Sequence, residues 1–229
     1  MKANIRASLH LYFIAGTQDM RHLSGDPAEN LLKILKQALE SGISCFQFRD
    51  KGQFSLVAQP KAQADLAQKC RRLCHDYHIP FIMNDDVELG LAVGADGIHI
   101  GQSDGNVKQI IERLKKQNLI FGLSINTLEQ LQHYRHYDAI DYFGIGPIFP
   151  TDSKPDHSAA LGVDFLDNLP QLAIDKPCVA IGGINTTNAT RLRQSGIDGL
   201  AVISAITQAP DICLAVRQLK AAPIILNNR

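Results

Sequence analysis

The chain has 229 residues, of which 45% are hydrophobic, and its 23 basic and 23 acidic side chains give a formal net charge of zero. This length suits one large domain or two small ones, and the lack of a basic excess argues against nucleic acid as a partner. No apolar run approaches the ~20 residues that a membrane-spanning helix requires, so we expect no membrane partner.

The amino-terminal residues resemble a weak signal peptide, with Lys2 and Arg6 before a short apolar run. That run contains His10 and is followed by no convincing cleavage site, so we interpret it as a first strand. The five cysteines are an odd number, which fits reduced thiols better than a secreted disulfide framework. We therefore expect a cytoplasmic protein.

Eight short apolar runs alternate along the chain with eight longer amphipathic stretches. The runs are too short for isolated helices and rich in β-branched or aromatic residues, which predicts buried strands. The predicted strands span residues 9–14, 43–48, 80–83, 97–100, 120–124, 141–145, 178–181 and 199–203. The predicted helices span residues 30–39, 57–77, 87–93, 107–116, 127–134, 163–169, 186–194 and 211–219.

This strict alternation indicates an α/β protein with a parallel sheet and helices outside it. Eight units in this length favour a closed (β/α)8 TIM barrel over an open, doubly wound sheet. The open sheet with a dinucleotide site would have a G-x-G-x-x-G turn after the first strand, and residues 16–19 do not supply it. We expect a single TIM-barrel domain over residues 1–229. Its longest irregular segment is 146–162, and long loops in compact domains are often functional lids.

In such a barrel, functional residues gather at the carboxyl ends of the strands. Gln47, Arg49 and Lys51 end the second predicted strand and share one side of it, together with Cys45 lower down. Such polar residues are expected inside a barrel when an anionic ligand binds at its open end. The alternative is an ordinary surface loop after the strand.

Acidic residues follow the next two strands. Asp86 is well placed to cap the following helix, which leaves Asp85 as the better metal ligand. Asp104, taken alone, is also better explained as a helix cap. Two carboxylates at neighbouring strand ends nevertheless suit Mg²⁺, which takes oxygen ligands and shares itself with substrate phosphates.

A second group of anion-binding candidates follows strands five to eight. Ser124 ends strand five, and the loop after strand six carries Thr151, Ser153 and Lys154. Gly182-Gly183 follows strand seven and Ile203-Ser204 ends strand eight, which is the usual phosphate site of such barrels. Two anion sites imply two phosphorylated substrates, or one substrate phosphorylated at both ends.

Several other residues are weaker candidates. Cys70, Cys74, His75 and His78 could suggest zinc, but they lie on a helical pattern and a structural role is favoured. His99 could reach the barrel interior, although a core histidine with satisfied hydrogen bonds is the simpler interpretation. His157 lies in the long loop, where a solvated side chain is the default.

In order along the chain, these motifs resemble those of the thiamine phosphate synthase family, over nearly the whole length. The segments that carry the resemblance are Gln47-x-Arg49-x-Lys51, Asn84-Asp85-Asp86, residues 95–104, Ser124, residues 146–151, Lys154, residues 181–184 and Ile203-Ser204. Asp50 stands where the family usually has Glu, and we expect its side chain to point away from the site.

The resemblance implies an enzyme that joins 4-amino-5-hydroxymethyl-2-methylpyrimidine diphosphate to a thiazole phosphate with Mg²⁺, releasing thiamine phosphate and diphosphate. It implies pyrimidine diphosphate binding by Gln47, Phe48, Arg49, Asp50, Lys51, Asn84, Ser124 and Lys154, of which Arg49, Lys51, Ser124 and Lys154 are catalytic. It implies thiazole phosphate binding by Thr151, Asp152, Ser153, Gly183, Ile203 and Ser204, and Mg²⁺ binding by Asp85 and Asp104.

We hypothesise a dissociative mechanism, because the chain shows no motif around a protein nucleophile. One alternative is a thiazole tautomerase-like paralogue on the same barrel, which would need neither the metal nor the diphosphate residues. Others are a sugar-phosphate isomerase, which should show a general base at a strand end, and a non-catalytic barrel that binds a phosphorylated metabolite. A homo-oligomer is compatible with the sequence, which gives no support for it.

Overall fold

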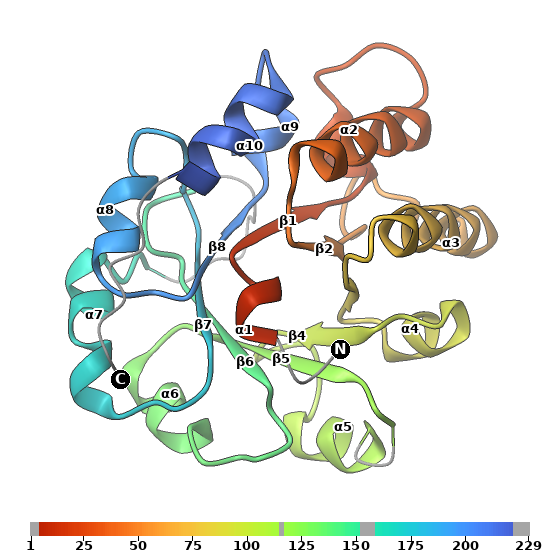
Figure 1. Cartoon of the computed structure of the whole chain (residues 1–229). Helices are drawn as coiled ribbons and strands as arrows, with labels where there is room; N and C mark the ends of the chain where they lie inside the picture. Colours follow the sequence, from red (N-terminus) through yellow and green to blue (C-terminus); the bar gives the residue numbers. More distant parts are fainter. Residues whose placement is uncertain (1–4, 115–116, 152–158, 222–229) are drawn as a thin grey trace.

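The computed structural model describes residues 5–114, 117–151 and 159–221. Eight parallel strands close into a barrel in chain order, with β8 paired to β1, and helices surround it (Figure 1). The TIM-barrel prediction is confirmed. The strands are β1 (Leu11–Ala15), β2 (Cys45–Phe48), β3 (Phe81–Asn84), β4 (Gly97–Ile100), β5 (Ile120–Ile125), β6 (Tyr142–Ile145), β7 (Cys178–Ile181) and β8 (Gly199–Val202).

The longer helices follow the predicted pattern. They are α2 (Pro27–Ser41), α3 (Pro60–Asp76), α4 (Val87–Val93), α5 (Val107–Leu114), α6 (Leu128–Tyr134), α7 (Val163–Asp167), α8 (Ala189–Gln194) and α10 (Ile212–Ala221). The residues at the two ends of α2 explain where this helix begins and ends. Asp26 accepts hydrogen bonds from the first backbone N–H groups, Pro27 occupies the first turn, and Gly42 ends the helix in the left-handed conformation.

Four short helical segments were not predicted: α1 (Ile5–Ser8), η2 (Thr17–Met20), η3 (Leu169–Leu172) and α9 (Ser204–Thr207). Each has four residues, too few to show an apolar period. Two predicted helices begin three residues later than expected. Helix α3 starts at Pro60, and α8 starts at Ala189 because the Asn185 side chain accepts from the N–H groups of Thr187 and Asn188, forming a turn there.

The strands separate two apolar cores. Tyr12, Ile14 and Cys45 belong to the cluster inside the barrel, whereas Phe13, Phe46 and Phe48 belong to the larger cluster between the barrel and the helices. All eight strands are therefore buried on both faces, as is usual for parallel sheets. Neighbouring strands end together at the carboxyl end of the barrel, which brings residues far apart in sequence around one opening. Within the described residues, no helix is long and apolar enough to cross a membrane.

Candidate active site

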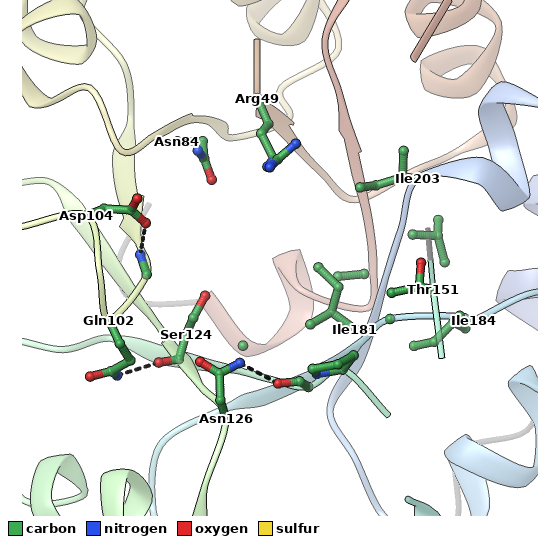
Figure 2. Close-up of a pocket in the computed structure, with 18 of the residues that line it drawn as sticks. Arg49, Asn84, Gln102, Asp104, Ser124, Asn126, Thr151, Ile181, Ile184 and Ile203 are labelled. Atoms are coloured by element: carbon green, nitrogen blue, oxygen red, sulfur yellow. Dashed lines mark hydrogen bonds between the residues drawn. The ribbon is translucent and has the colours of Figure 1, made fainter. Parts of the chain in front are cut away.

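A cavity of about 330 Å³ opens at the carboxyl ends of the strands. Side chains and backbone from the ends of β2 through β8 line it (Figure 2). Among the described residues, those of the predicted site that line it are Arg49, Lys51, Asn84, Asp85, Asp104, Ser124, Thr151, Gly183, Ile203 and Ser204. Asp152, Ser153 and Lys154, together with His157, lie outside the described residues.

Lys51, Asp85 and Asp104 form one charged cluster on the wall of the cavity. The Lys51 Nζ atom donates to Asp85 Oδ2 at 2.7 Å and to Asp104 Oδ1 at 2.8 Å. The other oxygen of Asp104 accepts from the Gly101 backbone N–H at 2.9 Å, which fixes the carboxylate. Asp85 has a φ of 61°, an uncommon conformation for a residue other than glycine. The loops after β2, β3 and β4 thus bring two carboxylates into contact with one ammonium group.

The electrostatics of this cluster follow from its partial burial. Burial raises the pKa of Asp85, and the charge of Asp104 adds to the rise, although the hydrogen bond from Lys51 opposes it. Burial acts on Asp104 in the same direction, but the hydrogen bonds from Lys51 and from the Gly101 N–H, together with the charge of Lys51, outweigh it and lower the pKa. Burial alone would lower the pKa of Lys51, but its bonds to both carboxylates raise it. Lys51 therefore stays charged beside two carboxylates that it neutralises only in part.

The residues present fit a magnesium ion. No group of three or more His, Cys, Asp or Glu side chains that could hold a metal occurs in the part of the chain that the structure describes. Mg²⁺ does not need such a cage, because it is usually held by one or two carboxylates together with water and substrate phosphates. Asp85 and Asp104 supply those two carboxylates, and both already lie within hydrogen-bond distance of one cationic atom.

Arg49 and Asn84 extend the polar wall, and Figure 2 shows both side chains pointing toward the centre of the cavity. Arg49 is only 7% exposed, and its backbone N–H donates to Ala15 O at 3.0 Å, which joins the ends of β1 and β2. Gln47 lies on the same side of β2 but deeper in the barrel. Its Nε2 atom donates to the Tyr12 hydroxyl at 2.8 Å, and it is not among the residues that line the cavity.

Phe48 and Asp50 do not line the cavity either. Side chains alternate along a strand, so the phase that turns Gln47 inward turns Phe48 outward, where it packs against Phe81. Asp50 points away, as its sequence position led us to expect, and accepts from Thr17 and from the Leu56 N–H. Asp50 thereby ties the loop after β1 to the loop after β2.

Amide side chains around Ser124 form a part of the site that the sequence analysis missed. Gln102 Nε2 donates to the Ser124 carbonyl at 2.6 Å, and Asn126 Nδ2 donates to the Gly146 carbonyl at 2.6 Å (Figure 2). Gln130 Oε1 in turn accepts from the Asn126 N–H at 2.7 Å, and all three amides line the cavity. Asn126 lies two residues after Ser124, so strand alternation could have identified it.

The opposite wall is built from backbone and apolar side chains. Gly182 and Gly183 have φ values of 97° and 64°, which glycine adopts without strain. A Cβ atom at Gly183 would lie 2.6 Å from Phe149 Cβ and 2.7 Å from the Pro150 carbonyl oxygen. These glycines therefore let the loop after β7 pack directly on the loop after β6, where Thr151 also lines the cavity.

The other buried candidate residues lie in surroundings that indicate structural roles. Cys70 and Cys74 are fully buried on α3, and burial raises the pKa of both thiols, which makes them unreactive. His99 is 7% exposed, lies inside the barrel and has a hydrogen-bond partner on each ring nitrogen, so both interpretations of this residue hold.

Comparisons with known proteins identify the family of the chain. The family model described as thiamine monophosphate synthase matches residues 11–206. A thiamine-phosphate synthase of Actinobacillus succinogenes is 54% identical over 94% of this chain and 97% of its own, and one of Haemophilus influenzae is 52% identical over 96% of each chain. The solved structure of a thiamine phosphate pyrophosphorylase from Pyrococcus furiosus is 32% identical, with a TM-score of 0.78 over 95% of this chain and 96% of that one. The chain belongs to the thiamine monophosphate synthase family.

Proposed function

We propose that this chain is a thiamine-phosphate synthase. It joins 4-amino-5-hydroxymethyl-2-methylpyrimidine diphosphate to 4-methyl-5-(2-phosphoethyl)thiazole and releases diphosphate. The observation that carries the proposal is one cavity with two unlike walls, each of which suits an anion. Lys51, Asp85 and Asp104 lie on one wall, and Gly183 and Ser204 lie on the other. The names of the relatives support the same reaction.

On the charged wall, Arg49 and Lys51 bind the diphosphate of the pyrimidine substrate. The Arg49 guanidinium is almost buried, so its bonds to phosphate oxygens form away from water and are strong. Asp85 and Asp104 would hold Mg²⁺, and Mg²⁺ would supply charge neutralisation for the diphosphate. Asn84 and Ser124 orient the substrate from the adjacent strand ends, and Lys154 is proposed to bind the same diphosphate.

On the opposite wall, the thiazole phosphate binds mainly to backbone. Gly183 and Ser204 contribute backbone groups, and Thr151 contributes a hydroxyl. Asp152 and Ser153 complete this phosphate site in the proposal. Ile181, Ile184 and Ile203 line the same side of the cavity and give an apolar surface for the thiazole ring.

The mechanism that these residues support is dissociative. The bond between the pyrimidine methylene carbon and the diphosphate oxygen breaks first, and its electron pair leaves with the diphosphate, whose negative charge Arg49 and Lys51 stabilise. The thiazole nitrogen then donates its lone pair to the pyrimidinylmethyl cation. No protein nucleophile is needed, so the residues act by positioning and by electrostatic stabilisation.

The test is diphosphate release by the purified chain with both substrates and Mg²⁺, and with each of the three omitted in turn. We expect release and thiamine phosphate formation only when all three are present. A chain that binds both phosphates without any turnover would overturn the proposal in favour of a metabolite-binding barrel. Isomerisation of a thiazole substrate without Mg²⁺ would instead indicate the tautomerase-like alternative.

A further inference from the structure

A row of hydrogen bonds crosses the inside of the barrel and ends at Ser124. Gln47 Nε2 donates to the Tyr12 hydroxyl at 2.8 Å, and the hydroxyls of Tyr12 and Tyr142 lie 2.9 Å apart. The Tyr142 hydroxyl lies 2.9 Å from His99 Nδ1, and His99 Nε2 lies 2.9 Å from Ser124 Oγ. The row links β2, β1, β6, β4 and β5, and its last member lines the cavity.

Two glycines make room for this row. His99 pairs in register with Gly122 on β5, and Gly122 pairs with Tyr142 on β6. A Cβ atom at Gly122 would lie 2.4 Å from the Tyr142 hydroxyl and 2.5 Å from His99 Nδ1, and one at Gly144 would lie 3.1 Å from His99 Cε1. The imidazole and the phenol thus occupy space that side chains on β5 and β6 would otherwise fill.

One arrangement of protons satisfies every polar group of the row. The Gln47 amide N–H can only donate, so the Tyr12 oxygen accepts it. In this arrangement Tyr12 donates to Tyr142, Tyr142 donates to His99 Nδ1, and the proton of the neutral imidazole on Nε2 is donated to Ser124 Oγ. Among the described residues, Ser124 Oγ has no other hydrogen-bond partner, so in this arrangement its own proton is available to a ligand in the cavity.

We propose that Tyr142 and His99 are positioning residues that present the Ser124 hydroxyl to the pyrimidine diphosphate as a hydrogen-bond donor. The inference rests on the proposed function and adds the role of the buried row. Ser124 then pairs with an acceptor atom of the substrate, a ring nitrogen or a diphosphate oxygen. Tyr142 acts only through Ser124, because two hydrogen bonds and the His99 ring separate it from the cavity.

Apolar filling alone does not account for these side chains. Buried hydroxyl and imidazole groups lose their hydration, and that loss is offset only when each finds a partner. Phenylalanine would fill the space of Tyr142 without this requirement. We therefore infer that the polar row does more than fill space. It contacts the cavity through Ser124, so Ser124 is the residue that it can affect there.

The test is a double-mutant cycle with Tyr142→Phe and Ser124→Ala, measured by steady-state diphosphate release with both substrates and Mg²⁺. Tyr142→Phe keeps the ring and removes only the hydroxyl. In the wild-type background we expect a fall in kcat of about 10- to 100-fold, as for loss of a group that orients a functional residue, with KM changed by less than about twofold. In the Ser124→Ala background we expect no further fall.

Val179→Ala is the matched control, because Val179 packs in the same barrel interior and carries no polar group. Thermal unfolding followed by circular dichroism reports the folding of each variant. Equal losses from Tyr142→Phe in both backgrounds, or a loss no larger than that of Val179→Ala, would overturn the positioning role. A wild-type chain without turnover would instead refute the proposed function itself, so the two failures are distinguishable.

Discussion

The two walls of the cavity present unlike chemistry to two anions. The wall from β2 to β4 uses charged side chains, with Lys51 held between Asp85 and Asp104. The wall from β6 to β8 uses glycine backbone and isoleucine side chains, and Figure 2 shows Ile181, Ile184 and Ile203 across the cavity from Asp104. The first wall concentrates formal charge, whereas the second offers neutral and rigid groups.

This difference matches what each anion would do under the proposed function. A phosphate that stays on its substrate needs only binding, which preorganised backbone groups provide. A diphosphate that leaves gains negative charge at its bridging oxygen, so groups that interact more strongly as this charge develops accelerate the reaction. Changes to the charged wall should therefore lower turnover, and changes to the backbone wall should weaken binding.

The largest expected effect is that of Asp85→Asn. Asparagine tolerates the left-handed backbone of this position, so the change removes charge with little strain. Mg²⁺-dependent diphosphate release should fall by about 10²- to 10³-fold, comparable to loss of one well-placed electrostatic group. The affinity for the thiazole phosphate, measured by calorimetry, should stay within about twofold, since that phosphate binds to the other wall.

Asp86→Asn is the control for this prediction. Asp86 is the next residue, is exposed, and caps α4 by accepting from the Leu89 N–H, a role that asparagine also fills. Full Mg²⁺-dependent turnover by Asp85→Asn would contradict the metal assignment and the contrast between the walls.

The second prediction concerns the backbone wall. In Gly183→Ala, the new Cβ meets Phe149 and the Pro150 carbonyl, and the residue must also adopt a φ of 64°. The strain is about 1–2 kcal/mol, and the loop must shift to relieve the contact. We expect KM for the thiazole phosphate to rise by about 10-fold, or about 1.4 kcal/mol, while kcat at saturation changes less.

Gly25→Ala is the control that separates the effect of backbone strain from the effect of a changed cavity wall. Gly25 has a φ of 91°, and a Cβ atom there would meet no atom within 4 Å. It should therefore lose stability in urea without any change in KM. A fall in kcat at unchanged KM for Gly183→Ala would show that the backbone wall also acts on the chemical step.

The sequence predicted the barrel because its strand pattern is local. Each run of four to six apolar residues is bounded by turns, and eight such runs in 229 residues leave few other architectures. The charged wall was also predictable, because Lys51, Asp85 and Asp104 each lie within four residues of a strand end. Position relative to the strand end was sufficient for these residues, since a parallel barrel brings all its strand ends together.

Strand alternation places Asn126 on the same side as Ser124, but the hydrogen bonds of the amide group and of the buried row were not predictable in the same way. Gln102 and Asn126 acquire their roles from the carbonyls of Ser124 and Gly146, which only the folded loops bring near. The row depends on the register of β4, β5 and β6, and on the space above Gly122, neither of which a single strand reveals. Phe48 and Asp50 show the converse, because they share a motif with Arg49 and Lys51 but face away from the cavity.

The smallest expected effect is on stability, and it comes from a buried carboxylate beside the charged wall. Burial raises the pKa of Asp19, on η2 near Arg49, to about 6 from its ordinary value of 3.8. The native state then binds this proton more tightly than the unfolded state, so stability falls as pH rises from about 4 to about 6 and the fall is complete above that range. Asp19→Asn keeps an acceptor for the Gly16 N–H and removes the charge. Relative to wild type, the variant should gain about 1 kcal/mol between pH 4 and pH 7, after allowance for partial exposure.

Urea unfolding followed by circular dichroism at several pH values measures this gain, with Asp65→Asn on α3 as an exposed control. An identical pH dependence in Asp19→Asn and wild type would mean that the Asp19 carboxylate is as well stabilised in the fold as in water. The charge of Arg49 would then have to offset its burial, and the charged wall would extend from the cavity to η2. A difference of the expected sign would instead show that Arg49 does not offset the burial of the Asp19 carboxylate. The buried carboxylates that a cation stabilises would then be those of the cluster around Lys51, whose ammonium group donates to both.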